Sequence, residues 1–235
     1  MDELAKAWDL SFQRGENHLF WPNEEIVRFI SKFVRKRVSF DTFVDVSEGT
    51  NPRILDFGCG TGRHMVFLSE MGLEAYGIDI SPTSVSLAKR VLAQVLEGSG
   101  IPLETTHERV FEVEGSNLPF DDGFFDHSIS HGVLDSMPFD DALASMAELS
   151  RVTKSRGLAY IDLVSSNQSS GITPGEYKVE ALYEKGTIQS YFDWQRIDEL
   201  LYPNWKLVDA KLVRNISREA QDLGSRFHLV AENLI

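Results

Sequence analysis

Hydrophobic and polar positions along this chain follow two alternating periods. Short apolar runs at strand length are separated by segments whose apolar residues recur at helical spacing. The expected strands cover residues 53–57, 73–78, 110–113, 125–130, 158–164, 205–214 and 226–232. The expected helices cover residues 63–71, 82–97, 140–152 and 194–201, with Ser81 as N-cap of the second and Gly157 ending the third.

Strands that alternate with helices indicate right-handed βαβ units. We therefore expect a Rossmann-like α/β fold, a seven-stranded mostly parallel sheet with helices on both faces. No helix-length segment separates the last two strands, so they should form a hairpin that leaves an antiparallel last strand. A ligand crevice is expected at the carboxyl ends of the parallel strands.

Two segments stand apart from this pattern. Residues 1–50 are expected to form an N-terminal helical cap and linker, with an apolar stripe from Ile26 to Val34 and the linker over residues 41–52. Residues 51–235 are expected to form the main domain. Within it, residues 166–192 form a long insertion without the apolar periodicity of a core, which is typical of a lid over a substrate.

Charge and composition narrow the classes of partner. The 235 residues include 23 Lys and Arg against 36 Asp and Glu, a net charge of −13, which disfavours nucleic-acid binding. A single cysteine excludes an intramolecular disulfide. The N-terminus lacks the basic start and apolar run of a signal peptide, and no apolar run is long enough to span a membrane. We expect a cytoplasmic protein with no membrane partner.

The segment after the first main-domain strand has the strongest chemical signal. Gly58, Gly60 and Gly62 lie between a strand and a helix, where backbone must turn with positive φ and approach a ligand closely. A dinucleotide fingerprint would need a glycine at Arg63. Asp56, two residues before the first glycine, suits a cationic ligand and would repel a pyrophosphate.

The second strand of the main domain ends at Asp79. A carboxylate at this position can accept both hydroxyls of a ribose. The alternative is a helix-capping acid, although Ser81 already provides the cap. A nicotinamide oxidoreductase stays an alternative, disfavoured by Asp56 and Arg63.

With these motifs in order, the sequence resembles the class I S-adenosylmethionine-dependent methyltransferases, in particular their small-molecule, type 11-like branch. Further elements are Glu114-Gly115 before Leu118-Pro119-Phe120, and Phe125-Asp126 before an apolar strand. The resemblance implies S-adenosylmethionine as cofactor, S-adenosylhomocysteine as product, and cofactor contacts at Asp56, Gly58, Cys59, Gly60, Gly62, Asp79, Ile80, Glu114, Gly115, Ser130 and His131.

The implied reaction is transfer of a methyl group to oxygen or nitrogen, in preference to carbon, of a small molecule. His131 follows the fourth strand and is a candidate base; the alternative is that only its backbone touches the cofactor. No set of hard oxygen ligands follows the fourth or fifth strand, so no metal is expected. A module that binds the cofactor without transferring the methyl group is the other alternative.

Aromatic residues of the two flanking segments are candidates for the substrate wall, and core packing is the alternative for each. They are Trp8, Phe12, Phe20, Trp21, Tyr177, Tyr183 and Tyr191.

Overall fold

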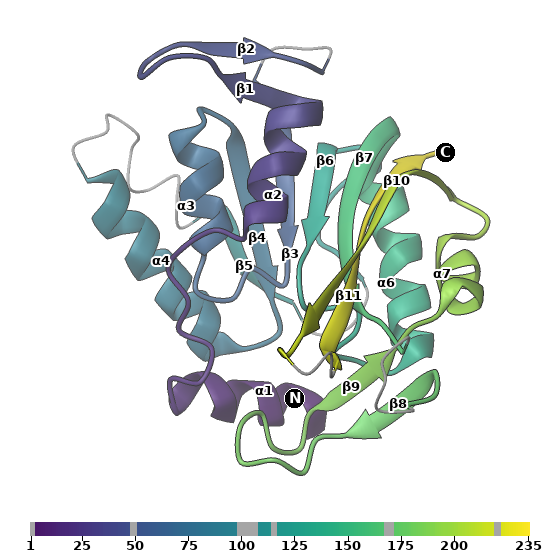
Figure 1. Cartoon of the computed structure of the whole chain (residues 1–235). Coiled ribbons are helices and arrows are strands. Elements are labelled where there is room, and N and C mark those ends of the chain that lie inside the picture. The colour runs from purple at the N-terminus through teal and green to yellow at the C-terminus, as the bar shows by residue number, and fades with distance from the viewer. Residues whose placement is uncertain (1–2, 48–50, 98–107, 114–116, 167–171, 219–221) are drawn as a thin grey trace.

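A computed structural model describes residues 3–47, 51–97, 108–113, 117–166, 172–218 and 222–235. Within these ranges, seven strands form one sheet in the order β10-β11-β7-β6-β3-β4-β5 (Figure 1). Their bounds are β3 (Arg53–Phe57), β4 (Glu74–Asp79), β5 (Val110–Glu112), β6 (Phe125–Ser130), β7 (Thr153–Val164), β10 (Trp205–Ile216) and β11 (Asp222–Asn233).

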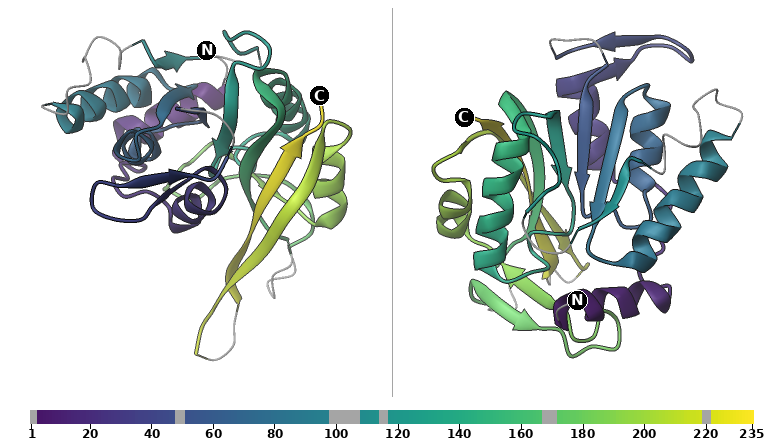
Figure 2. Two further views of the ribbon diagram at one scale, coloured as in Figure 1. Left: turned by 90° about the horizontal axis from the view of Figure 1, so that it is seen from above. Right: turned by 180° about the vertical axis from the view of Figure 1, so that it is seen from behind.

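The strand directions confirm the expected Rossmann-like arrangement. β3, β4, β5, β6 and β7 pair in parallel, whereas β11 pairs antiparallel with both β7 and β10. The last strand is therefore the antiparallel one, as the missing crossover helix predicted. The long β10–β11 ribbon extends beyond the sheet in the view from above (Figure 2).

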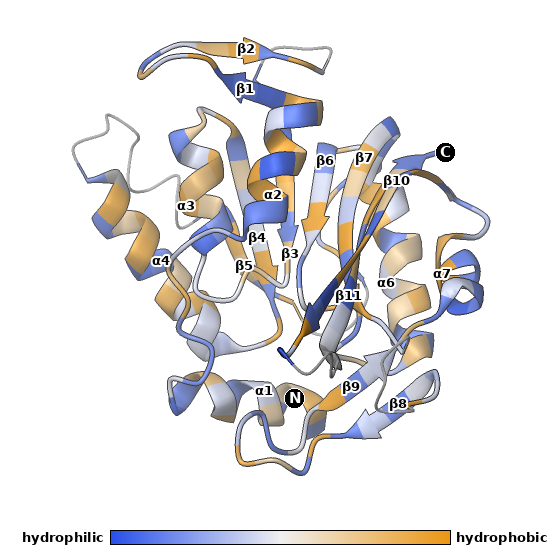
Figure 3. Cartoon of the chain, viewed as in Figure 1, coloured by the Kyte–Doolittle hydropathy of each residue, from blue (hydrophilic) through white to orange (hydrophobic). Residues whose placement is uncertain are grey.

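Helices cover both faces of the sheet and create two hydrophobic clusters. One face packs against α2 (Glu24–Phe29), the π-helical turn η1 (Ile30–Val34), α3 (Arg63–Glu70) and α4 (Pro82–Leu96), and the other against α6 (Phe139–Val152) and α7 (Trp194–Leu201). Hydrophobic and hydrophilic residues alternate along α2, α4 and α6 (Figure 3), as expected of helices with one buried face. None of the described helices is long and apolar enough to cross a bilayer.

The expected role of Gly157 is wrong. α6 ends at Val152 and the chain continues directly into β7, so Gly157 lies within a strand. A Cβ there would lie 2.5 Å from the Asp126 carbonyl oxygen, and this close approach is what requires glycine. Asp126 itself is structural, because its carboxylate accepts the Arg53 N–H at 2.8 Å and fixes the start of β3.

The N-terminal segment is only partly helical. After α1 (Glu3–Gln13), α2 and η1, the chain forms an antiparallel pair, β1 (Arg35–Arg37) and β2 (Phe43–Asp45). The expectation of a linker from residue 41 is wrong over β2. Strands of three residues leave too short a pattern to read, and the Arg35–Asp45 ion pair across them, at 2.6 Å, depends on pairing in space.

The 166–192 insertion also has structure of its own. Its described part contains an antiparallel hairpin of β8 (Gly175–Lys178) and β9 (Ile188–Tyr191), and the Phe192 ring that follows is fully buried. The expectation of a loop without a core is therefore wrong. This hairpin and α1 lie side by side at the carboxyl ends of the parallel strands, as Figure 1 and the rear view in Figure 2 show.

Candidate functional site

The glycine loop between β3 and α3 has the backbone that its sequence predicted. Gly58, Gly60 and Gly62 have φ values of +73°, +54° and +81°, and Gly62 is the residue from which α3 starts. A Cβ at Gly58 would lie 2.3 Å from Cγ2 of Val133 in the loop after β6. Glycine is needed here because two chain segments approach each other beside open space.

Asp79 connects this loop to the neighbouring strand. Its carboxylate accepts the Gly60 N–H at 2.9 Å and the Ser81 N–H at 2.9 Å. Burial raises the pKa of Asp79 even though these N–H groups favour the charged form. Two oxygens with about four acceptor directions leave room for ligand hydroxyls. Ser81 is the N-cap of α4, accepting the Ser84 N–H at 3.1 Å, as predicted.

A cavity of about 440 Å³ opens at this end of the sheet. Its lining comes from the glycine loop, the ends of β4 and β6, the loop after β6, α1, and the connection between β8 and β9. The lining residues are Leu4, Trp8, Phe12, Asn17, Leu19, Phe57, Gly58, Cys59, Gly60, Thr61, Arg63, His64, Ile78, Asp79, Ile80, Val113, His131, Gly132, Val133, Ser136, Met137, Asp141, Ser145, Glu184, Gln189 and Arg226.

The turn that follows α1 and the β8–β9 connection meet at this cavity. The Tyr183 hydroxyl donates to the Glu16 carbonyl oxygen and lies 3.1 Å from Oδ1 of Asn17, and the Glu184 N–H donates to the Glu16 carboxylate at 2.9 Å. The Trp8 indole N–H lies 3.4 Å from the Ser136 carbonyl oxygen. Two segments about 170 positions apart in the sequence thus form one cover, which we call the cavity cover (residues 3–21 and 172–192).

Comparison with known proteins decides which family this geometry belongs to. A family model described as a methyltransferase domain matches residues 55–161, which contain the glycine loop, Asp79 and the strand before His131. Residues 55–161 are thus a methyltransferase domain of the class I S-adenosylmethionine-dependent type.

Individual curated proteins are similar to this chain over part of their length. The mitochondrial ubiquinone biosynthesis O-methyltransferase of Schizosaccharomyces pombe is 32% identical over 120 residues, which are 50% of this chain and 38% of that protein. The chain spans 38 to 50% of the length of the curated relatives it matches.

Solved structures share the fold at lower identity. A methyltransferase from Methanosarcina mazei has a TM-score of 0.63 and 20% identity over 80% of this chain and 95% of that chain. The 1,6-didemethyltoxoflavin-N1-methyltransferase of Burkholderia thailandensis has a TM-score of 0.58 and 20% identity over 80% and 73% of the two chains.

The residues at the cavity fit the cofactor of this family. Asp56 is almost fully buried and its Oδ2 has no partner among the described residues, as expected of a carboxylate that awaits a cationic ligand group. Arg63, at the first turn of α3, lines the cavity and is available for a ligand carboxylate. Burial lowers the pKa of Arg63, and the sequence analysis did not single it out as a ligand contact.

The other predicted cofactor contacts divide into three groups. Cys59 and Ile80 line the cavity with Gly58 and Gly60, and His131 does so from the other side, whereas Gly62 lies outside the lining. Asp56 and Ser130 lie behind the lining as buried side chains, and the Ser130 hydroxyl also lacks a partner within the described ranges. Glu114 and Gly115 lie outside the described residues.

The predicted substrate wall is only partly assembled at the cavity. Trp8 and Phe12 line it. The remaining five aromatic residues are outside the lining, and Trp21 is 84% exposed. They are Phe20, Trp21, Tyr177, Tyr183 and Tyr191. Tyr183 acts instead as a contact between the two halves of the cavity cover.

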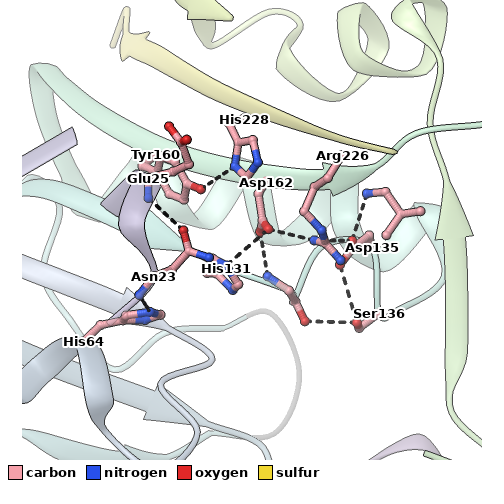
Figure 4. A network of polar contacts seen from close by, with 12 residues as sticks. Asn23, Glu25, His64, His131, Asp135, Ser136, Tyr160, Asp162, Arg226 and His228 are labelled. Carbon is pink, nitrogen blue, oxygen red and sulfur yellow. Dashed lines mark hydrogen bonds and ion pairs between the residues drawn. The ribbon is translucent and has the colours of Figure 1, made fainter. Parts of the chain in front are cut away.

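His131 is the end of a buried polar network that the sequence analysis missed (Figure 4). Asp162 on β7 accepts the Gly132 N–H at 2.7 Å and a hydrogen bond from Nη1 of Arg226 at 2.7 Å. The same Arg226 nitrogen donates to Asp135 at 2.8 Å. Burial raises the pKa of Asp135 to about 6, against the effect of Arg226. Asp162, Asp135 and Arg226 come from three elements far apart in the sequence, so they form no local motif. The one signal in the sequence was Asp162, an acidic residue within an apolar strand.

The second cavity histidine, His64, belongs to α3. Its Nδ1 lies 3.7 Å from Oδ1 of Asp56, and its ring centroid lies 5.5 Å from that of His131. Among the described residues, no three or more His, Cys, Asp or Glu side chains are grouped so that they could hold a metal ion.

Proposed function

We propose that this methyltransferase transfers a methyl group from S-adenosylmethionine to an oxygen or nitrogen atom of a small molecule. The observation that carries the proposal is one covered cavity that brings together the glycine loop, Asp79 and His131. The first two lie where a nucleoside and an amino-acid chain can bind, and the imidazole lies at the opposite wall.

The chain's own residues would act mainly by binding and orientation. The backbone of the glycine loop, with Asp56 and Arg63, would hold the charged amino-acid end, and Asp79 would accept the ribose hydroxyls. When bound, S-adenosylmethionine supplies a methyl group already activated by a sulfonium. Trp8 and Phe12 would then hold the acceptor in line with that methyl group and exclude water.

The cavity supports a small acceptor. Its volume of about 440 Å³ lies in the range of small-molecule sites. The cavity cover, which is part of the same chain, contributes to its lining. The Schizosaccharomyces pombe relative is named for ubiquinone biosynthesis, which also supports a small-molecule acceptor. Trp8 and Phe12 favour an acceptor with an apolar or aromatic part.

Calorimetry with S-adenosylhomocysteine tests the cofactor assignment. Binding in the micromolar range or tighter is expected, and Asp79→Ala should weaken it by about 1–3 kcal/mol because the ribose hydroxyls lose a charged acceptor. Asp209→Asn is the matched control, because Asp209 is a carboxylate on β10 paired with Lys32 at 2.6 Å and outside the cavity lining.

Transfer assays with a library of small hydroxyl and amine compounds test the activity. Transfer to at least one compound is expected, with an unchanged rate in EDTA. Tight binding of S-adenosylhomocysteine without any transfer would favour a binding module. Binding of a nicotinamide dinucleotide in its place would contradict the family's cofactor at this site.

A further inference from the structure

The buried network behind His131 defines which of its two ring nitrogens meets the acceptor. We propose that Asp162, held by Arg226 and the Gly132 N–H, is a positioning residue that keeps the proton of His131 on Nε2, so that Nδ1 takes the proton of a hydroxyl acceptor. This inference rests on the proposed function and names its acceptor class.

The surroundings of His131 differ between its two nitrogens. Nε2 is buried, has no hydrogen-bond partner among the described residues, and lies 3.5 Å from Oδ2 of Asp162. The His131 side chain is nevertheless 16% exposed and lines the cavity. The accessible part of the ring therefore excludes Nε2, which leaves Nδ1 as the ring nitrogen through which His131 could contact an acceptor.

Hydrogen bonds hold both carboxylate oxygens of Asp162 in place. Its side chain is fully buried, Oδ1 accepts the Gly132 N–H, and Oδ2 accepts from Arg226. Gly132 directly follows His131, so one carboxylate contacts both the backbone and the ring of the same loop. Oδ2 can accept a second hydrogen bond, and the 3.5 Å distance needs to shorten by about half an ångström for the Nε2–H to donate.

The charges around His131 keep it neutral. Burial lowers the pKa of His131 to about 4, and although the Asp162 carboxylate opposes this, His64, Arg63 and Arg226 act in the same direction as burial. Asp162 keeps its charge, because Arg226 and the hydrogen bond from the Gly132 N–H lower its pKa despite its burial. A neutral imidazole beside an ionised carboxylate has one N–H and one lone pair, and the carboxylate selects the N–H that faces it.

This arrangement matches a hydroxyl acceptor. As the oxygen attacks, its proton moves to Nδ1 of His131, the new carbon–oxygen bond forms, and the electron pair of the breaking carbon–sulfur bond stays on sulfur. His131 becomes an imidazolium, which the Asp162 carboxylate stabilises, and then releases the proton to solvent. A neutral amine has a free lone pair for the attack and loses its proton afterwards, so it needs no base at this position.

The tautomer of His131 tests the inference without any turnover. Two-bond ¹H–¹⁵N correlation spectra of the wild-type protein at pH 7 should show His131 protonated on Nε2. His127, another buried histidine on β6, is the matched control because its Nδ1 accepts the Leu158 N–H at 3.0 Å and so must also carry its proton on Nε2. A His131 proton on Nδ1 in the wild-type spectrum would overturn the inference.

The variant Asp162→Asn should reverse this tautomer. The Gly132 N–H holds the amide oxygen at the Oδ1 position. Arg226 keeps its hydrogen bond to Asp135 but loses the one to residue 162, so the amide NH₂ takes the Oδ2 position and donates to Nε2 of His131. The proton then moves to Nδ1, and the base is lost. We expect kcat to fall by about 10²- to 10⁴-fold with a hydroxyl acceptor, while the Kd of S-adenosylhomocysteine changes less than about threefold. The His127 signals should stay unchanged.

Acceptor pairs on the same scaffold, such as a phenol and the corresponding aniline, complete the test. The wild type should methylate the hydroxyl compound, and Asp162→Asn should lose this activity. A wild type that methylates the amine and not the hydroxyl compound would contradict the hydroxyl acceptor. A folded Asp162→Asn protein with kcat within about threefold of wild type would overturn the positioning role. Failure of S-adenosylhomocysteine to bind the wild type would instead contradict the proposed function. The tautomer of His131 in the wild type needs no cofactor, so it would still test the positioning role of Asp162.

Discussion

The two walls of the cavity are built in opposite ways. The wall with the glycine loop and Asp79 comes from residues 53–81. These residues form one strand–loop–helix–strand unit that ends at Ser81, the N-cap of α4. The facing wall combines α1, the loop after β6, the β8–β9 connection and Arg226 of β11, which are spread over most of the chain.

The two walls therefore depend on interactions of different range along the sequence. The positive φ of Gly58 and the hydrogen bond from the Gly60 N–H to Asp79 depend only on residues of this one unit. The facing wall depends on contacts such as that of Tyr183 with Glu16, which exist only when distant segments have packed. We therefore expect changes in the first wall to affect cofactor binding, and changes in the second wall to affect transfer.

Gly58→Ala should have the largest effect, because it introduces a Cβ 2.3 Å from Cγ2 of Val133 at a φ of +73°. We expect S-adenosylhomocysteine to bind at least about 100-fold more weakly, with an unfolding free energy lower by roughly 1–3 kcal/mol. Calorimetry and urea unfolding measure both. Gly224→Ala is the control, because Gly224 also has positive φ but nothing within 4 Å of an added Cβ. Unchanged binding by Gly58→Ala would remove the distinction between the walls.

Removal of residues 1–21 should affect transfer more than cofactor binding. The deletion takes away Trp8 and Phe12 and the Thr61–Leu19 hydrogen bond of 2.6 Å, so water enters the cavity. We expect kcat/KM to fall by about 100-fold or more while the sheet stays folded by circular dichroism. The single variant Trp8→Ala should raise the KM of the acceptor with little change in S-adenosylhomocysteine affinity. Full activity of the truncated chain would place the acceptor elsewhere.

Acid should destabilise the protein through its buried histidines. Burial lowers the pKa of His131 and of His127 to about 4, below the value near 6.5 in the unfolded chain, so the unfolded state binds more protons as pH falls through this window. Between pH 7 and 5 each histidine should cost about 2 kcal/mol, and Asp135, whose pKa is raised to about 6, should offset roughly 1 kcal/mol.

Urea unfolding at the two pH values measures this loss. His131→Gln should reduce the difference between pH 7 and pH 5 by about 2 kcal/mol, since glutamine does not titrate. An unchanged difference would mean that His131 is as easily protonated in the folded protein as in the unfolded one.

Tyr183→Phe should have the smallest effect, because it removes only one hydroxyl from the contact between the two halves of the cavity cover. We expect amide exchange in residues 3–21 and 172–192 to become about three times faster, and bound S-adenosylhomocysteine with acceptor to slow it again. Tyr177→Phe is the control, since the Tyr177 hydroxyl bonds Thr173 within the hairpin segment. Equal exchange rates with and without ligands would mean that the cavity cover is fixed scaffold.

Local sequence determined the wall with the glycine loop and Asp79, and most of the fold. The positive φ of Gly58, the cap at Ser81 and the antiparallel last strand follow from interactions over a few residues or from the length of one connection. Such interactions leave a pattern in the sequence that can be read without knowing the rest of the molecule. The same holds for α7, whose expected and observed bounds coincide.

Tertiary structure alone decided the facing wall and the buried network behind it. Asp162, Asp135 and Arg226 come from β7, the loop after β6 and β11, and only the strand order β11-β7-β6 brings their side chains together. The hairpin of β8 and β9 was missed because its short strands pair with each other and pack on the loop after β6, where the Ser190 N–H donates to the Asp135 carbonyl oxygen at 2.7 Å. Long-range hydrogen bonds and buried charges carry no periodicity, so the sequence contains these residues without indicating that they meet.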